Sequence, residues 1–169
     1  ATIKTTKQEE PKSNRQESFL TLETDLYEVI ISNKHGGSIV SFKLFEYLTH
    51  DSFFVNLIND LNKNNLVIDC KSNSGNDVDL SLPWFVKQKP NPGLITEPTT
   101  VVFFTESTLG TLEKSLTFFP DSYVIQVDIN TKNISEKVFS GQYFFSWKGG
   151  LPLTEKNKTD DLIYTNSFI

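Results

Sequence analysis

The sequence predicts an all-β protein in which two mainly antiparallel sheets pack face to face. Three observations lead to this fold class. From Phe19 onward, β-branched and aromatic residues recur with a period of two, as they do in half-buried strands. Clusters of Gly, Pro, Asn and Asp separate these runs at short intervals. The runs number more than ten, which suits a large sandwich better than a small barrel.

Residues 1–18 differ in composition from everything that follows. They are polar, mixed in charge and nearly free of large apolar side chains. Such a segment cannot bury enough surface to offset the entropy lost on ordering. We therefore expect a linker or tail over 1–18 and a β-sandwich domain over 19–169.

The front half begins with strands at 19–24 and 26–32, and a third strand follows at 37–47. The connection between the last two is a predicted structural turn made by Asn33, Gly36 and Gly37. Glycine adopts a positive φ without penalty, and asparagine tolerates left-handed geometry. This interpretation places His35 at the apex of the turn, exposed to solvent.

Shorter strands are predicted in the middle of the chain, at 53–58, 66–70, 84–88 and 100–107. The stretches 71–83 and 89–98 are rich in Gly, Pro, Asn and Asp and are expected to be loops. Residues 54–61 leave two possibilities open. They fit a strand, but Phe54, Leu57, Ile58 and Leu61 also have the spacing of a short helix.

The clearest strand is 122–130, where Tyr123, Ile125, Val127 and Ile129 fall on one face and polar residues on the other. The preceding strand, 110–120, places Leu112, Leu116 and Phe118 on one side. The following run, 136–150, groups Tyr143, Phe145 and Trp147. Three long strands joined by short connections predict a meander.

Composition excludes several classes of function. The net charge of −5 makes binding to a nucleic-acid backbone improbable. Cys70 is the only cysteine, so no intrachain disulfide forms. No apolar run approaches the roughly 18 residues that cross a bilayer. The complete absence of methionine favours a piece excised from a longer protein.

No set of residues suggests catalysis, a metal or a cofactor. His35 and His50 lie far apart in the sequence and Cys70 stands alone, so no zinc-type ligand spacing occurs. The sequence His50-Asp51-Ser52 is a poor catalytic triad, because neighbouring residues in a strand point to opposite faces. We predict no catalytic residue, no metal and no cofactor.

Aromatic side chains are the candidate binding residues. Trp84 stands at a loop edge, and Tyr143, Phe145 and Trp147 share one strand. If they are exposed, these rings could line a groove for a sugar or a peptide. If they are buried, they belong to the core, which is the more common role of aromatics at alternating strand positions.

Two segments resemble the large periplasmic domain of the bacterial membrane-protein insertase YidC. The stretch LETDLYEVIISNKHGGSIVSFKLFEY resembles the opening of that domain, and TLEKSLTFFPDSYVIQVDINTKNISEK resembles a later hairpin. A third, FVNLI, is similar to a short segment between them. The matching positions are Thr24, Asp25, Ile31, Asn33, Gly36, Gly37, Ile39, Ser41, Leu44, Tyr47, Lys114, Phe118, Tyr123, Val127 and Asn133.

The resemblance implies a β-supersandwich like that of galactose mutarotases, with none of the matching positions catalytic. It also implies a domain that lies between a first transmembrane helix and the helices that perform insertion, on the periplasmic face of the bacterial inner membrane. Residues 1–18 are then the tether from that first helix. The domain is expected to be incomplete here and to continue with further strands beyond Ile169.

Two functions from different classes follow. The first is a non-catalytic, chaperone-like module of an insertase, which contacts nascent membrane proteins and components of the Sec translocon. The alternative is a mutarotase-like sugar-binding or aldose-epimerase domain, since mutarotases share the opening motif. Epimerisation needs an acid and a base facing one sugar ring, and no histidine lies in the central strands. Binding of an extended peptide or glycan is a third option.

Overall fold

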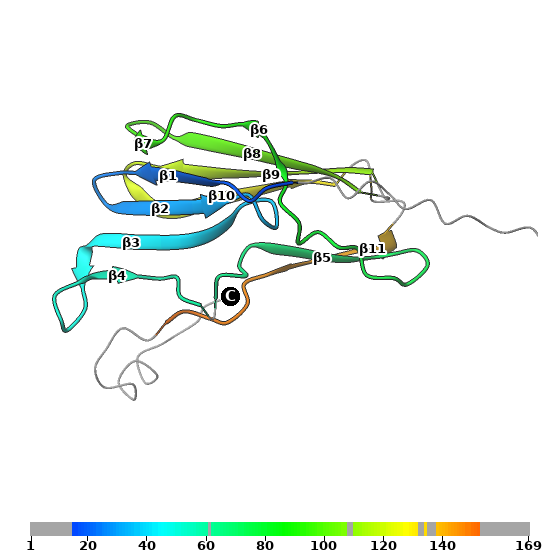
Figure 1. Cartoon of the computed structure of the whole chain (residues 1–169), viewed down its shortest axis with the longest axis horizontal. Coiled ribbons are helices and arrows are strands. Elements are labelled where there is room, and N and C mark those ends of the chain that lie inside the picture. Colours follow the sequence, from blue (N-terminus) through cyan, green and yellow to red (C-terminus); the bar gives the residue numbers. More distant parts are fainter. Residues whose placement is uncertain (1–14, 61, 108–109, 132–133, 135–137, 153–169) are drawn as a thin grey trace, which may run out of the picture.

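The computed structural model describes residues 15–152 with the exception of 61, 108–109, 132–133 and 135–137 (Figure 1). The described residues form strands joined by turns and loops. These strands are β1 (Phe19–Glu23), β2 (Tyr27–Ser32), β3 (Ser38–Leu48), β4 (Phe54–Asn56), β5 (Val67–Ser72), β6 (Phe85–Gln88), β7 (Gly93–Leu94), β8 (Thr99–Ser107), β9 (Gly110–Phe119), β10 (Ser122–Asn130) and β11 (Val138–Ser146).

The strands belong to three sheets. A five-stranded sheet has the order β4-β3-β2-β1-β7, and a four-stranded sheet has the order β10-β9-β8-β6. The remaining two strands, β5 and β11, pair only with each other among the described residues and form a ribbon beside the two larger sheets (Figure 1). Neighbouring strands are antiparallel, except that β7 pairs with β1 in parallel.

The core lies between the inner faces of the two larger sheets. Tyr27 on β2 is fully buried, and its ring stacks on Phe42 of β3 with 4.8 Å between ring centroids. Its hydroxyl donates a hydrogen bond of 2.9 Å to the carbonyl of Phe119 on β9, so it joins one sheet to the other. Burial raises the pKa of Tyr27 to about 12. Each large apolar side chain buried here stabilises the fold by roughly 1.5–3 kcal/mol.

The predicted fold class is confirmed: the protein is an all-β antiparallel sandwich. Most predicted strands lie within a few residues of the observed ones. The open question at 54–61 is resolved in favour of a strand, because β4 covers Phe54–Asn56 and no helix follows in the described residues. Strand β7 is absent from the sequence prediction, since its two residues form a strand only through the long-range pairing of Gly93 with Leu22.

The predicted meander is only partly correct. Strands β8, β9 and β10 form it, and exposed and half-buried residues alternate along β10 as predicted. The third predicted member, β11, instead leaves this sheet and pairs with β5, where Tyr143 lies opposite Cys70. A period-two pattern shows which residues share a face, but it does not specify the neighbouring strand.

The last four residues of the predicted linker contact the folded body. Glu17 accepts a 2.7 Å hydrogen bond from the Ser32 hydroxyl and forms a 2.7 Å ion pair with Lys34. These two interactions lower the pKa of the Glu17 carboxyl. Arg15 lies over the ring of Phe85, 4.5 Å from its centroid. The rest of the predicted tether and the part of the predicted domain after residue 152 lie outside the described residues.

Candidate functional site

The chain turns at Gly36-Gly37 between β2 and β3, and this turn is packed more tightly than a surface turn. Both glycines have a positive φ, of 70° and 100°. A Cβ atom added to Gly36 would lie 2.6 Å from Trp84 Cε3, and one added to Gly37 would lie 2.6 Å from Phe103 Cε2. Real Cβ atoms do not approach other atoms this closely. Glycine is therefore required here both by the backbone conformation and by the lack of space.

Asn33 has a different role from the predicted one. It is buried, and its side chain bonds to two other segments of the chain. The Nδ2 atom donates to the carbonyl of Trp84 at 3.0 Å, and Oδ1 accepts from the backbone amide of Ser18 at 2.9 Å. The non-glycine residue with left-handed geometry in this turn is His35, with a φ of 53°. Asn33 thus contributes hydrogen bonds rather than backbone freedom.

Trp84 is part of the core. Only 2% of its surface is exposed, and its indole Nε1 donates a 3.0 Å hydrogen bond to the carbonyl of Leu80. The binding interpretation of Trp84 is therefore corrected in favour of the core interpretation, because a ring enclosed in this way offers no face to an external ligand. The ring packs against Gly36 of the turn instead.

A buried lysine that we did not predict as a functional residue lies beside the turn. Lys114 on β9 is fully buried and projects to the same face as Leu112 and Leu116. Its ammonium donates to the carbonyl oxygens of His35 at 2.8 Å and Leu66 at 2.7 Å. The nitrogen also lies 5.9 Å from the centroid of the Trp84 ring, within cation–π range.

His35 is half-buried, so the prediction of an exposed apex is wrong. Removal of its imidazole from water is the main reason why its pKa lies below 6.5, and the positive charge of Lys114 acts in the same direction. The turn folds back over Lys114, and this is why its apex is covered. The carbonyl that binds Lys114 belongs to the backbone, so this contact does not depend on the histidine side chain.

Large apolar side chains are exposed on both faces of the end of β11 and just after it, and we call this set the β11 aromatic strip. Its members and their exposed fractions are Phe144 at 64%, Phe145 at 49%, Trp147 at 39% and Leu151 at 62%. The core interpretation is therefore wrong for Phe145 and Trp147, whereas Tyr143 is half-buried and packs against the core. The physical reason is that, among the residues that the structure describes, β11 belongs to a two-stranded ribbon with too few neighbours to cover both faces.

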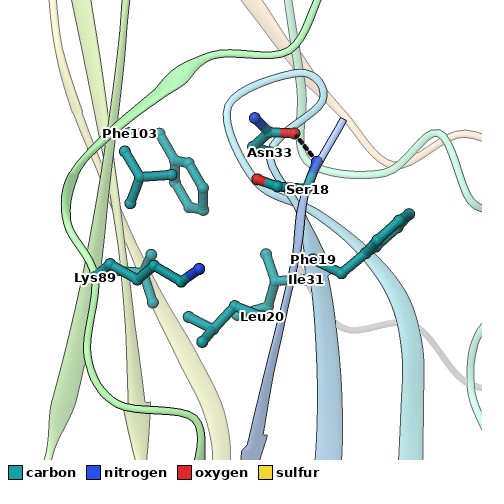
Figure 2. Close-up of a pocket in the computed structure, with 9 residues that line it drawn as sticks. Ser18, Phe19, Leu20, Ile31, Asn33, Lys89 and Phe103 are labelled. Carbon is teal, nitrogen blue, oxygen red and sulfur yellow. Dashed lines mark hydrogen bonds between the residues drawn. The ribbon is translucent and has the colours of Figure 1, made fainter. Parts of the chain in front are cut away.

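The cavity between β1, β2 and β8 is not a ligand site. Figure 2 shows Leu20, Ile31 and Phe103 around it, together with the hydrogen bond between Ser18 and Asn33. Its volume is about 10 Å³. A single water molecule needs at least about 10–15 Å³ on this measure. The space is therefore a packing gap between the two sheets.

The remaining polar candidates do not form a reactive group. His50 is exposed on the β3–β4 hairpin and lies 3.0 Å from the carboxylate of its neighbour Asp51. Within the described residues, no three His, Cys, Asp or Glu side chains come close enough together to hold a metal ion. The same residues contain no helix that is long and apolar enough to cross a membrane.

Comparison with known proteins gives consistent results. The family model for the YidC periplasmic domain matches residues 20–168. A protein from Chlorobaculum parvum named membrane protein insertase YidC is 28% identical over 153 residues, which cover 88% of this chain and 26% of that protein. Proteins of the same name from Chlorobium luteolum and Chlorobaculum tepidum are 26% and 25% identical, over 89% and 86% of this chain.

The chain spans about a quarter of the length of these curated relatives. No solved structure matches it significantly.

Proposed function

The chain belongs to the YidC periplasmic-domain family, and from that premise we propose that it is the non-catalytic periplasmic module of a membrane-protein insertase. In this proposal the module assists the insertion and folding of inner-membrane proteins by contacting them, while other parts of the full-length protein perform the insertion. The relatives that carry the insertase name support this assignment. The β11 aromatic strip is the observation that supports a role in binding.

The strip has the composition of a docking surface for an apolar polypeptide. Three large aromatic side chains and Leu151 are substantially exposed over a short length of chain. The charges beside it are neutralised, because Lys148 and Asp69 form an ion pair of 3.2 Å. Aromatic side chains are enriched where one protein binds another, since they provide a large contact area at low entropic cost. We infer that the strip recognises its partner through apolar contacts rather than through charge.

The occupant that fits this surface is an extended apolar segment of a nascent membrane protein. Among the described residues, β11 has one hydrogen-bonded neighbour, β5. An extended segment could pair with the free side of β11 while its side chains rest on the aromatic rings, as in β-strand addition. Components of the Sec translocon are proposed partners of the full-length protein on the same premise, at the periplasmic face of the inner membrane. Residues 1–18 are the proposed tether to a preceding membrane helix.

Substitution of the strip tests this proposal. Phe145→Lys with Trp147→Lys replaces two exposed rings at alternate positions of the strip with charges, and Val124→Lys on β10 is a matched control at another exposed apolar residue. Binding to a labelled transmembrane-segment peptide is measured by fluorescence anisotropy. The double variant is expected to weaken the affinity at least ~10-fold, or ~1.4 kcal/mol, while the control stays unchanged. Equal affinities for all three proteins would contradict the proposed surface.

The sugar-enzyme alternative gains no support from the site geometry. His50, the histidine beyond the opening motif, is exposed on a hairpin beside Asp51 rather than facing a cavity. His35 lies in the turn, next to the buried ammonium of Lys114. An aldose epimerase needs an acid and a base within hydrogen-bond reach of one sugar ring, and these two histidines are not arranged in that way.

A further inference from the structure

The two carbonyl groups that accept hydrogen bonds from Lys114 share an uncommon backbone conformation. His35 and Leu66 both have a φ of 53°, and they are two of the three non-glycine residues with a positive φ in the described chain. Such residues cost of order 1–3 kcal/mol each and persist only when their surroundings hold them. Here both carbonyl oxygens bind the same Nζ atom. The ammonium therefore stabilises two strained positions at once.

These contacts connect three parts of the fold. Lys114 lies on β9 in the four-stranded sheet, and His35 lies in the turn between β2 and β3 of the five-stranded sheet. Leu66 immediately precedes β5, the strand that pairs with β11. Cys70 on β5 and Val138 on β11 are also part of the main core. The position of the β5–β11 ribbon against the sandwich therefore depends in part on a single nitrogen atom.

We propose that Lys114 is a proton-linked latch that holds the β5–β11 ribbon against the sandwich. In the closed state its amine lies in a dry site and bonds to His35 and Leu66. When the ribbon opens, water reaches the amine, which then takes up a proton more readily. Acidification favours the open state, because that state binds the proton more tightly. The latch does not depend on what the β11 aromatic strip binds.

The electrostatics of the closed site support this coupling. Among the described residues, no carboxylate forms an ion pair with Lys114. Burial lowers its pKa from 10.5 to about 7. The two carbonyl acceptors and the Trp84 ring favour the charged form and oppose part of that change. Between the closed-state pKa of about 7 and the ordinary pKa of 10.5, which the amine regains in the open state, the open state binds more protons than the closed state. Opening therefore becomes easier as the pH falls. Below about pH 7 the opening equilibrium no longer changes with pH through Lys114, because the amine is protonated in both states.

Other titratable groups near the latch act in different pH ranges. His35 in the turn has a pKa below 6.5, and Lys34, Lys148 and Asp69 also influence it. Cys70, on the β5 strand, has a pKa above 9, mainly because of burial and further because of Asp69. Between pH 7 and 8.5 these groups change their protonation little in the closed protein. In the open state the Cys70 thiol regains its ordinary pKa of about 8.5 and opposes the Lys114 effect only near the upper end of that window, so Lys114 dominates the linkage.

Cys70 provides a direct measure of ribbon opening. It is the only cysteine of the chain and is buried on β5, four positions after Leu66. Its reaction with a disulfide reagent such as DTNB requires local opening of the ribbon. The rate in the native protein, divided by the rate in the urea-unfolded chain at the same pH, gives the opening equilibrium. This ratio is expected to increase as the pH falls from 8.5 to 7, by up to ~10-fold per pH unit.

Two variants identify the responsible group. Lys114→Met is expected to abolish the pH dependence of the opening equilibrium. Lys87→Met is the matched control, because Lys87 is an exposed lysine on β6 that pairs with Glu113, and it is expected to behave like the wild type. An opening equilibrium that is independent of pH in the wild type, or unchanged pH dependence in Lys114→Met, would overturn the latch.

A second measurement covers the case in which Lys114→Met does not fold. The lysine side-chain carbons of the wild-type protein are followed by NMR as the pH is varied. One lysine is expected to titrate well below the usual value of about 10.4. If every lysine titrates near that value, the closed site does not disfavour the proton and the proposal fails.

Discussion

Gly36 and Trp84 are in such close contact that no side chain fits between them: a Cβ atom on the glycine would lie 2.6 Å from Cε3 of the indole ring. The indole is itself fixed, because Nε1 bonds to Leu80 and the backbone of Trp84 bonds to Asn33. The turn and the tryptophan therefore constrain each other. Substitutions at Gly36 or at Trp84 are expected to lower the stability of the whole sandwich.

Gly36→Ala is expected to lower the free energy of unfolding by about 2–4 kcal/mol, from the backbone strain at a φ of 70° together with overpacking against the ring. Gly75→Ala is the matched control. Gly75 has a φ of 82°, but a Cβ atom added there would have no other atom within 4 Å, so only the backbone strain of about 1 kcal/mol applies. Urea unfolding followed by tryptophan fluorescence measures both. Equal losses would show that the contact with Trp84 is unimportant.

Asn33→Ala is expected to destabilise the protein by about 1–3 kcal/mol. The substitution leaves the buried carbonyl of Trp84 without its side-chain partner, and a buried unsatisfied group costs about 1–3 kcal/mol, whereas the exposed Ser18 can bond to water instead. Asn76→Ala is a suitable comparison, because Asn76 is exposed and bonds to the exposed Ser74. Its effect is expected to stay within about 0.5 kcal/mol. A small loss at Asn33 in urea unfolding would contradict its assigned role.

Global stability is expected to increase with pH between 7 and 8.5. The folded-state pKa of Lys114, about 7, lies below its ordinary value of 10.5, so the unfolded chain binds more protons in this interval. The penalty for burying the lysine is complete below about 7 and is relieved as the pH increases, by at most ~1.4 kcal/mol per pH unit. Cys70 acts in the opposite direction as the pH rises through the ordinary thiol pKa of about 8.5, because burial raises its pKa in the folded protein.

The midpoint of urea unfolding at several pH values measures this dependence, and Lys114→Met is expected to remove it. A midpoint that does not increase between pH 7 and 8.5 in the wild type would show that the carbonyl groups of His35 and Leu66 fully compensate the burial of the amine.

The chain is expected to leave the mutarotation of α-galactose and α-glucose at its uncatalysed rate. The reason is the position of the two histidines: His50 is exposed on a hairpin beside Asp51. His35 lines an open pocket of about 300 Å³ together with Glu17, but that carboxylate is already bound to Lys34 and Ser32 and is not free to act as a base. Polarimetry follows the change in optical rotation directly. Acceleration that disappears in His50→Ala would favour the sugar enzyme over the insertase module.

Much of the fold could be predicted because local physics determines it. The alternation along 122–130 identified β10 and its inward face, which the burial of Tyr123, Ile125, Val127 and Ile129 relative to their neighbours confirms. The glycine pair identified the reversal between β2 and β3, since few other residues adopt a positive φ. Both signals depend only on residues that are close together in the sequence.

The candidate site depends on contacts between distant segments, which the sequence does not specify. The aromatic run at 143–147 could be recognised in the sequence. Its exposure to solvent, however, depends on the pairing of β11 with β5, a strand far earlier in the chain. Trp84 is buried because the turn at Gly36 folds beneath it.

Lys114 shows the difference most clearly. Its position between Leu112 and Leu116 on an inward face was a signal in the sequence, although a lysine at such a position could equally have reached solvent along the strand. Its partners are carbonyl groups that lie 79 and 48 positions away along the chain. Every residue carries a backbone carbonyl, so no residue type marks these acceptors. Only the folded chain brings two of them to the same nitrogen.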